Sequence, residues 1–556
     1  MSRIAHREVR WPHLDTVPVG AWTVPVRSGM AGAETLEFSQ PPRTSDVLRA
    51  GTTRAPGAVS RCARLRIAAV PLFAAILAGC TVGPDYRSPA PPSAAGYTPE
   101  PQPKSTLSAP GNAGAAQQLN PTADIPAEWW LLFRSPQLDR MVREALDHSP
   151  TLTQAVARLT QAQEEANART GATRYPSVTG QLSAQREKVN LSSLGVPFPN
   201  PPPFTLLNGS VAVSYALDLF GGNRRLIESL NAQREYENWQ LHAARLMLAG
   251  NVVSAAIRQA QLRSQIEITR TMVALEQRIL AITEQRYSAG GVSEYEVRSQ
   301  RTALAKVQAS LPLLENQLDI VNHQLALLMG KTPVDARVEQ ISLETLNLPR
   351  ELPVSLPSSL ARQRPDIRAA EALLHAACAN VGVATANLYP QIDLTGSVGA
   401  VGTSFANGGP IWAFGAQLAQ PIFQGGSRRA ERRKAVAAYE EAGSAYQQTV
   451  LQGFREVADV LCAIGHDAQA LQARSEAALQ ADAAYQIASR RHESGGISQL
   501  ALLDAQRQQL QTSLDQILSQ AARYSDSATL FQALGGGWWN EPSSSEAKLK
   551  HPGSEQ

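Results

Sequence analysis

The sequence has few of the residues that mark most enzyme and metal sites. Only four of its 556 residues are cysteine, too few for a disulfide framework in a chain of this length, and no Cys-x-x-Cys or Cys/His cluster predicts a zinc site. The nine histidines are scattered. No glycine-rich loop has a Walker lysine or a Gly-x-Gly-x-x-Gly frame. We therefore expect no metal site, no cofactor and no enzymatic activity.

The sequence also has no large excess of one charge sign and few long apolar runs. The 51 Lys+Arg and 48 Asp+Glu leave a net charge of +3, which argues against a nucleic-acid partner. A mean hydropathy of −0.20 excludes a polytopic helical membrane protein, because such a bundle needs repeated apolar spans of about 20 residues. Hydrophobic residues still make up 43%, enough to form a large core.

One short apolar run is present, Ile67–Leu77, and its flanks resemble a secretory signal. Three arginines precede it and the small residues of Leu77-Ala-Gly-Cys80 follow it. The run is too short to span a bilayer. Leu-Ala-Gly-Cys resembles the bacterial lipobox, in which the cysteine is diacylated and begins the mature chain. The residue after the cysteine is Thr81. An aspartate there would resemble a signal for retention in the inner membrane, so its absence resembles sorting to the outer membrane. The alternative is an ordinary signal peptide with an incidental Cys80.

The segments around this signal have no helical or strand period. We interpret residues 1–58 as an extension from a start codon placed too early, and residues 59–79 as the complete signal. The Pro/Ala-rich composition of residues 80–128 cannot form a core and predicts an extended linker behind a lipidated Cys80. Residues 539–556 are predicted to be a disordered tail.

From Trp129 onward the sequence repeats itself. We assign a first copy to residues 129–330, a connector to 331–357 and a second copy to 358–538. The spacing of matched landmarks shortens by about ten residues in the second copy, so one loop of the first copy must be longer. The landmarks are His148-Ser-Pro with Gln363-Arg-Pro, Tyr175-Pro with Tyr389-Pro, and Arg286-Tyr-Ser-Ala-Gly-Gly-Val-Ser with Arg491-His-Glu-Ser-Gly-Gly-Ile-Ser.

Two stretches in each copy alternate apolar and polar residues, which predicts β-strands. They begin at Val178 and Val211 in the first copy and at Ile392 and Trp412 in the second. Strands of about ten residues suit an outer-membrane barrel, but the smallest single-chain barrels have eight. Strand edges cannot stay unpaired in lipid. The strands must therefore be shared between protomers, eight from two chains or twelve from three.

A long proline-free helix is predicted after each strand pair, over Asn223–Tyr287 and Ser427–Glu493. Each would span about 100 Å, and a returning helix of about 35 residues follows each one. The first helices, Pro136–Ala172 and Ser358–Leu388, must cover the remaining length. A seven-residue apolar repeat predicts left-handed coiled coils, and hence a coiled tube. The repeat positions are Ile266, Val273, Leu280 and Tyr287, and Val450, Val457, Ile464, Leu471, Ala478, Tyr485 and His492.

Together these features resemble the TolC-like outer membrane factors, in particular the NodT-type efflux lipoproteins. The resemblance runs from about Cys80 to Trp538. It implies an α+β membrane protein, with four transmembrane β-strands per chain in a shared trimeric 12-stranded barrel and a periplasmic tunnel of coiled-coil helices. The residues that carry it are Leu77-Ala-Gly-Cys80, Val82-Gly-Pro-Asp-Tyr-Arg87, Trp129-Trp130, both Tyr-Pro pairs, Arg364-Pro-Asp-Ile367, both Gly-Gly tips and Leu502-Leu-Asp-Ala-Gln-Arg507.

The resemblance implies the outer membrane channel of a tripartite efflux pump, lipid-anchored in a Gram-negative cell. Such a channel conducts drugs or other small toxic solutes passively. The implied partners are two further copies, a periplasmic adaptor protein, an inner-membrane transporter and outer-membrane lipid. The same duct could instead serve type I protein secretion or heavy-metal efflux. A structural periplasmic spacer is a remoter alternative, because a spacer needs no barrel.

The resemblance also implies a constriction just after the second Gly-Gly tip. Leu500, Asp504 and Arg507 match it and share one helical face. Three aspartates around a three-fold axis would form a cation-filtering ring, and three leucines a hydrophobic constriction. Alternatively, Asp504 and Arg507 simply pair on an exposed face. The corresponding first-copy residues, Tyr295, Ser299 and Thr302, carry no charge.

Both tips are expected to contact the helical hairpin of the adaptor. Their glycines permit a sharp helix-to-helix turn without a side-chain penalty. The alternative is that they are turn glycines only. The expected contact residues are Arg286, Tyr287, Gly290, Gly291 and Ser293 in the first tip, and Arg491, Gly495, Gly496 and Ser498 in the second.

The lipobox interpretation predicts that Cys80→Ala abolishes labelling by a radioactive fatty acid and lowers membrane retention, because the thiol is the acylated atom. Labelled whole cells and fractionated membranes measure both. Cys462→Ala is the matched control and should keep the label. Continued labelling of Cys80→Ala would contradict the interpretation.

Overall fold

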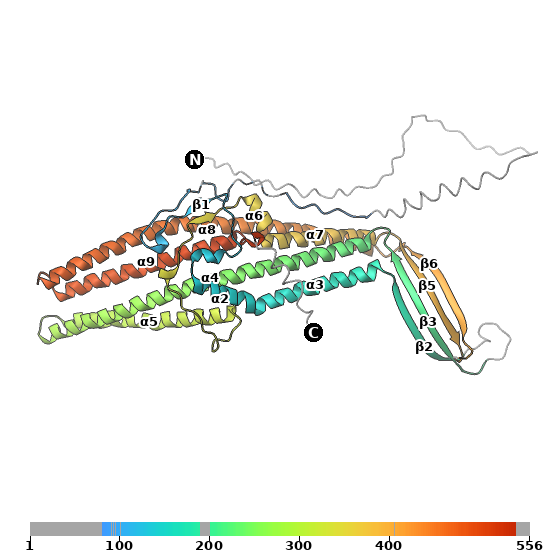
Figure 1. The fold of residues 1–556 in the computed structure, drawn as a ribbon, viewed down its shortest axis with the longest axis horizontal. Helices are drawn as coiled ribbons and strands as arrows, with labels where there is room; N and C mark the ends of the chain where they lie inside the picture. The colour runs from blue at the N-terminus through green and yellow to red at the C-terminus, as the bar shows by residue number, and fades with distance from the viewer. Residues whose placement is uncertain are drawn as a thin grey trace, which may run out of the picture. The chain divides into compact units, whose positions relative to one another are not determined.

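The computed structural model describes residues 81–540, except for 91, 93, 95, 101, 189–200 and 405. Residues 1–80, with the predicted extension, the signal and Cys80, lie wholly outside the described residues. Most of the predicted tail also lies outside them. One compact unit begins at Thr81 and combines long helices with a four-stranded sheet at one end of them (Figure 1).

The sheet consists of four antiparallel strands in the order β2-β3-β5-β6. As expected, the longer connection is in the first copy, over residues 188–203 against 403–408 in the second. The outer edges of β2 and β6 pair with no other described strand. The strands are β2 (Ser177–Glu187), β3 (Phe204–Leu217), β5 (Gln391–Gly402) and β6 (Gly409–Ala419).

The strand register gives the sheet one apolar face. Val178, Val213 and Phe414 lie in one row across the strands. The next row on the same face contains Val398 and Trp412. Phe414 is 83% exposed and Trp412 74%, values that fit a lipid-facing surface. The opposite face carries small and polar residues, in rows such as Ser177, Ser214, Thr395 and Gly415. The predicted alternation is thus confirmed.

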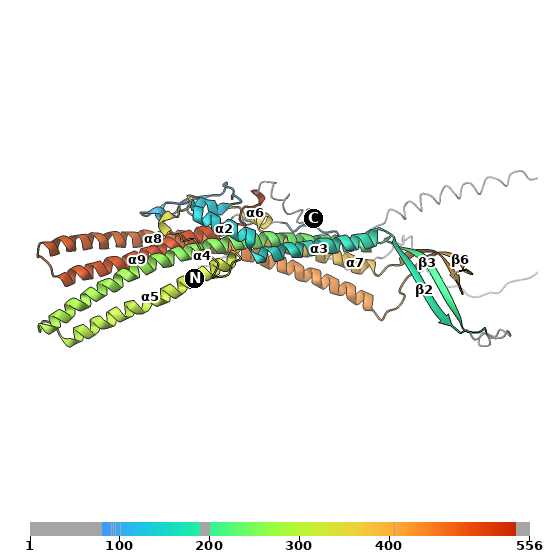
Figure 2. The ribbon, with the colours of Figure 1, turned by 60° about the horizontal axis from the view of Figure 1, so that its bottom comes forward.

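Two helices of 67 residues form the length of the unit, α4 (Gly222–Ser288) and α8 (Ser427–Glu493). Each is followed by a returning helix of 35 residues, α5 (Glu294–Leu328) or α9 (Gln499–Ala533). The predicted bounds of α4 and α8 are within one residue of those observed, and the returning helices have the predicted length of about 35 residues. In the half away from the sheet, α4 packs against α5 and α9, and α8 packs against α9 (Figures 1 and 2).

The first helix of each copy is not continuous, which corrects the prediction of single helices over Pro136–Ala172 and Ser358–Leu388. Pro150 and Pro365 each begin a new helix, because proline lacks an amide hydrogen and forces the preceding residue into an extended conformation. Ser149 and Arg364 have ψ values of 123° and 125°. The resulting helices are α2 (Pro136–His148), α3 (Pro150–Arg174), α6 (Pro357–Gln363) and α7 (Pro365–Ala386).

The predicted seven-residue seam holds only in part. In α8, Val450, Val457, Ile464 and Leu471 are buried, whereas the positions nearer the tip are half-buried. In α4 the prediction was wrong beyond Ile266, since Val273 and Leu280 are half-buried and Tyr287 is 47% exposed. Here α4 contacts two helices, α5 and α9, so its buried face is broader than one seam. Met272, Leu275 and Ile279 are buried instead.

Of the described helices, α7 alone is long and apolar enough to cross a bilayer by length and composition. However, 56% of its most apolar window is buried inside the structure. It packs against both α4 and α8. We therefore interpret α7 as a core helix of the bundle.

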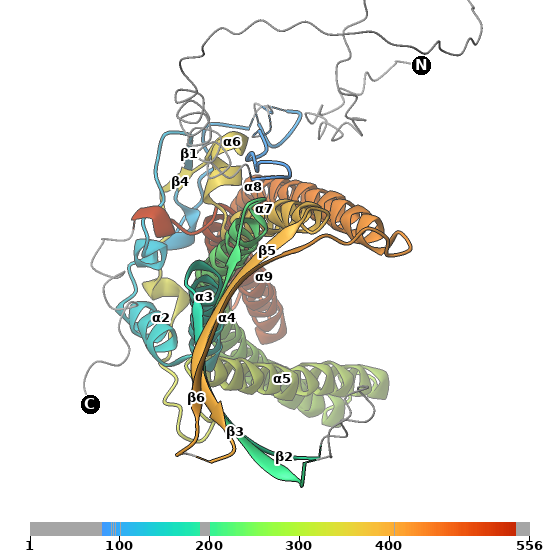
Figure 3. The ribbon, with the colours of Figure 1, turned by 90° about the vertical axis from the view of Figure 1, so that its right-hand side faces the viewer.

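A belt of short elements lies at mid-length of the helices (Figure 1) and covers their convex side (Figure 3), and we call it the equatorial belt. It contains α2, α6 and a parallel pair of strands, β1 (Gln118–Asn120) and β4 (Glu351–Pro353). Residues 80–128, which include β1, were predicted to be an extended linker without a core. Ala113, Gln117 and Ile125 are nevertheless buried, because the helices supply the apolar surface that this segment lacks.

Arg523 of α9 fixes that segment to the bundle. Its side chain is buried and donates hydrogen bonds to the backbone oxygen of Ala113 (3.0 Å) and to Gln117 Oε1 (2.8 Å). Burial lowers the pKa of this guanidinium. One turn further, burial and a hydrogen bond with Asp467 raise the pKa of Asp526 to about 8. This shift favours the protonated carboxyl of Asp526 in the folded protein at neutral pH.

This proton predicts a pH-dependent stability. Between pH 4 and 8 the folded protein binds a proton at Asp526 that the unfolded chain has lost, so the free energy of unfolding falls as pH rises through this window. Asp526→Asn should remove this pH-dependent loss of stability, because asparagine does not titrate. We expect its melting temperature to exceed the parent's at pH 8 by a few degrees, at about 1 °C per kcal/mol for a folded chain of this size. The difference should shrink towards pH 4.

Thermal melting of the detergent-extracted protein measures this. The matched control is Asp319→Asn, at an exposed position of α5, which should leave the pH profile unchanged. If Asp526→Asn melts at or below the parent at pH 8, Asp526 is ionised in the folded state.

Candidate functional site at the helical tips

The two tips lie at the ends of the helices away from the sheet and have the same backbone geometry (Figure 1). Gly290 has a φ of 68° and Gly495 a φ of 75°, the left-handed region in which glycine has no penalty. The next residue closes each helix, since the Gly291 N–H donates to the Arg286 oxygen at 2.8 Å and the Gly496 N–H to the Arg491 oxygen at 2.7 Å. Each tip is thus a glycine-dependent turn.

The two predicted tip serines begin the returning helices. Ser293 forms a capping box with Glu296 at the start of α5, and Ser498 Oγ accepts a hydrogen bond from the Ala501 N–H at 3.2 Å in α9. Tyr287 and Arg491 are exposed. The serines and glycines therefore shape the turns, and the exposed side chains are available for contact.

A cluster of charged and polar side chains joins three helices behind the tips, and we call Glu276, Gln300, Asp504 and Arg507 the gate cluster. Arg507 Nε donates to Glu276 Oε1 at 2.6 Å and Arg507 Nη2 to Glu276 Oε2 at 3.1 Å. Arg507 Nη1 reaches Asp504 Oδ1 at 3.2 Å. Gln300 of α5 donates to the same Glu276 carboxylate. One acidic group of α4 thus joins α4 to both returning helices.

Burial separates the two partners of Arg507. The Glu276 side chain is 3% exposed and that of Asp504 60%. Exposed ion pairs contribute about 0–1 kcal/mol, whereas removing one partner of a buried pair costs about 3–5 kcal/mol, because a buried charge is left without compensation. Arg507 is itself 37% exposed, so solvent screens this pair in part and reduces the cost. Even so, the bond to Glu276 is the stronger of the two.

The pairing of Asp504 with Arg507 was predicted from the sequence, whereas the contact of Arg507 with Glu276 was not. The two bonded residues Arg507 and Glu276 are 231 positions apart, and no local pattern connects them. The sequence offered one signal for this contact: Glu276 is a charged residue among apolar residues of α4, directly after Leu275. The predicted pairing of Asp504 with Arg507 on an exposed face is therefore only part of the arrangement.

An apolar layer lies next to the gate cluster. Leu275 and Ile279 of α4 and Leu503 of α9 are buried against one another. Leu500, predicted to form a constriction, is half-buried and packs against this layer. The layer excludes water from one side of Glu276, which strengthens its bond to Arg507.

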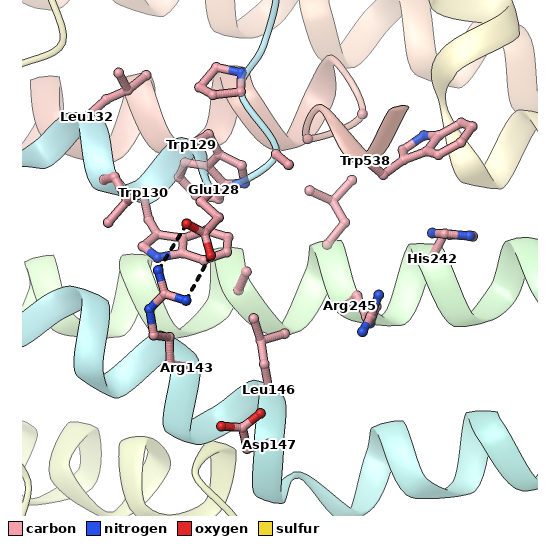
Figure 4. Close-up of a pocket in the computed structure, with 17 residues that line it drawn as sticks. Glu128, Trp129, Trp130, Leu132, Arg143, Leu146, Asp147, His242, Arg245 and Trp538 are labelled. Carbon is pink, nitrogen blue, oxygen red and sulfur yellow. Dashed lines mark hydrogen bonds and ion pairs between the residues drawn. The ribbon is translucent and has the colours of Figure 1, made fainter. Parts of the chain in front are cut away.

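A separate cavity of about 690 Å³ lies at the equatorial belt (Figure 4). Its wall includes Trp130, Trp538 and an ion pair between Arg143 and Glu128 at 2.9 Å. It contacts α4 at residues 242–249, roughly 40 Å along the helix from Glu276. Among the described residues, no group of three potential metal ligands occurs. The cavity and the gate cluster are therefore separate features, and we assign no function to the cavity.

The fold defines the class of this protein. A strand quartet with an apolar face, continuous with helices of 67 residues, is the protomer of an outer membrane channel with a periplasmic helical tunnel. The structure of the outer-membrane channel OprN superposes with a TM-score of 0.72 at 30% identity, over 83% of this chain and all of that one. The Campylobacter jejuni CmeC outer membrane channel shares the fold, with a TM-score of 0.71 at 20% identity, over 84% of this chain and 98% of that one.

Sequence comparison gives the family. The model of the outer membrane efflux protein family matches residues 141–331 and 356–536. The pyoverdine export outer membrane protein OpmQ of Pseudomonas aeruginosa is 32% identical, over 81% of this chain and 95% of that protein. The toluene efflux pump outer membrane protein TtgI of Pseudomonas putida is 30% identical, over 85% of this chain and 99% of that protein. The chain belongs to the outer membrane efflux protein family, and the predicted TolC-like resemblance is confirmed.

Proposed function

We propose that three copies of this chain form the outer membrane duct of a tripartite pump that expels small solutes, and that the gate cluster holds its periplasmic mouth closed. The proposal of a duct is supported by the four-stranded sheet, whose two outer edges pair with no other described strand, and by the long helices joined to it. The relatives named above export pyoverdine and toluene, which supports small solutes over secreted proteins as cargo. The exposed tips are the surface proposed for the adaptor, whose bound transporter would supply the solute.

The strand directions support closure between copies. Because β2, β3, β5 and β6 alternate in direction, β2 of one copy and β6 of the next also run antiparallel. Any number of copies could continue the pattern. Eight strands from two copies would enclose an interior that side chains fill, which leaves no duct. Twelve strands from three copies are the smallest solution that conducts.

This arrangement predicts that the detergent-extracted protein contains three chains. Native mass spectrometry and chemical crosslinking measure the number directly. A stable monomer in the membrane would contradict the shared barrel, since unpaired strand edges in lipid cost several kcal/mol per group.

The gate cluster predicts a hierarchy of effects on closure. Arg507→Ala should shift the closed-to-open equilibrium towards the open form by at least about tenfold, because it leaves Glu276 buried without its cation. Glu276→Gln should act in the same direction, and the double variant should be less than additive. Asp504→Ala should open the channel less but lower its cation preference. Single-channel recording in planar bilayers measures the open fraction and the ion selectivity of all four variants.

The matched control is Arg298→Ala, which breaks an exposed ion pair with Glu294 on α5 near the same mouth. It should leave conductance unchanged. If Asp504→Ala opens the channel as strongly as Arg507→Ala while Glu276→Gln has no effect, the aspartate ring alone forms the gate. If all variants conduct and select ions as the parent does, the gate lies elsewhere.

A further inference from the structure

The sheet passes into a long helix at two places, once in each copy, and the two junctions differ in charge balance. The first has the sequence Phe220-Gly-Gly-Asn-Arg-Arg225 and the second Phe423-Gln-Gly-Gly-Ser-Arg-Arg429. Each places two arginines in the first turn of a 67-residue helix. The start of a helix already carries partial positive charge, so cations there are unfavourable unless an anion is close.

The first junction supplies its own anions. The Asp218 carboxylate accepts hydrogen bonds from the backbone N–H groups of Asn223 (3.1 Å) and Arg224 (2.9 Å). Arg225 is bound by Asp85 at 2.6 Å and Glu228 at 2.8 Å. The ring of Phe220 stacks on Tyr389, with 4.7 Å between centroids. Protein groups thus compensate the cations and cover the aromatic ring.

The second junction has the two arginines but lacks acidic residues corresponding to those of the first junction. Pro421 stands at the position of Asp218, the first turn of α8 contains no acidic residue, and Gly426 provides no side-chain cap. Arg428 contacts Glu431 at 3.5 Å. Four further cations are exposed and form no ion pair with any residue of the described chain: Arg429, Arg432, Arg433 and Lys434.

Large apolar side chains lie beside these cations. Ile422 is 97% exposed and Phe423 is 88% exposed. They follow β6, whose lipid-facing Trp412 and Phe414 are exposed as well. Apolar side chains next to cations, at the end of a membrane-spanning strand, are typical of the boundary between acyl chains and head groups.

A neighbouring copy would not neutralise this cluster. If β6 pairs with β2 of the next copy, as the proposed trimer requires, the closest added segment is the end of α3, which leads into β2. After Glu165 that segment contains Arg169 and Arg174 and no carboxylate. Assembly would therefore add cations to this cluster, and we infer that the compensating anion comes from outside the protein.

We propose that residues 422–434 bind anionic glycerophospholipid of the periplasmic leaflet, with phosphate at the four cations and acyl chains against Ile422 and Phe423. The periplasmic leaflet is the source because the junction lies at the end of the sheet next to the helices (Figure 1). This site rests on the proposed shared barrel. It is independent of the gate cluster, which joins α4, α5 and the start of α9 near the tips.

The test compares lipid affinities of the purified trimer by native mass spectrometry, with phosphatidylglycerol and phosphatidylcholine as probes. The triple variant Arg429→Gln, Arg432→Gln, Arg433→Gln should lose phosphatidylglycerol affinity by about fivefold per cation, on the order of 100-fold in all. Phosphatidylcholine affinity should change little. In the unmodified trimer, phosphatidylglycerol retention should fall as ionic strength rises.

Two matched variants separate charge from fold. The same three positions changed to lysine keep the charge and should keep the affinity. Neutralising three exposed cations far from the junction, Arg278, Lys306 and Arg362, should also keep it. Unchanged phosphatidylglycerol affinity in the triple glutamine variant, or salt-independent retention in the parent, would overturn the proposal. So would altered ion selectivity in planar bilayers with unchanged lipid affinity, since the cluster would then line the lumen.

Discussion

The structure depends on one constraint: a peptide group in lipid must be hydrogen-bonded within the protein. The four strands hydrogen-bond to one another in the interior of the sheet, and the peptide groups on the outer edges of β2 and β6 have no partner strand among the described residues. Only further copies can close those edges without an aqueous partner. The long helices continue from the strands, so they must surround the same axis as the barrel. The tunnel is therefore a consequence of barrel closure, and its length is set by α4 and α8, which have 67 residues each.

Duplication supplies the scaffold of this protein, and divergence between the copies supplies its polar sites. Both copies have the same strand pair, long helix, glycine turn and returning helix. The gate cluster takes its arginine from the second copy and its buried carboxylate from the first. At the junctions, the first copy keeps Asp218 and gains Asp85 from the N-terminal segment, while the second copy has neither. Each polar site thus uses a position at which the copies no longer match.

Sequence patterns predicted the elements better than their packing. The strand alternation around Val178 and Trp412 and the bounds of α4 and α8 were correct, because periodicity reports the face that a segment buries. The breaks at Pro150 and Pro365 were missed, although proline gives a direct local signal for them. The α4 seam failed for another reason. A seven-residue repeat assumes one neighbouring helix, and the number of neighbours is not a local property.

The sequence by itself determined the class of fold, the duplication, the turns at the glycine tips and the pairing of Asp504 with Arg507. The strands, helices, turns and this pairing depend on residues close together in the chain, and the duplication is visible as a repeat of those local patterns. Tertiary structure alone decided that Glu276 is the buried partner of Arg507, that Arg523 fixes the N-terminal segment, and that the pKa of Asp526 is raised. These depend on burial and on contacts between distant segments. Desolvation sets the strength of an ion pair and the pKa of a carboxyl group, and it exists only once the helices have packed.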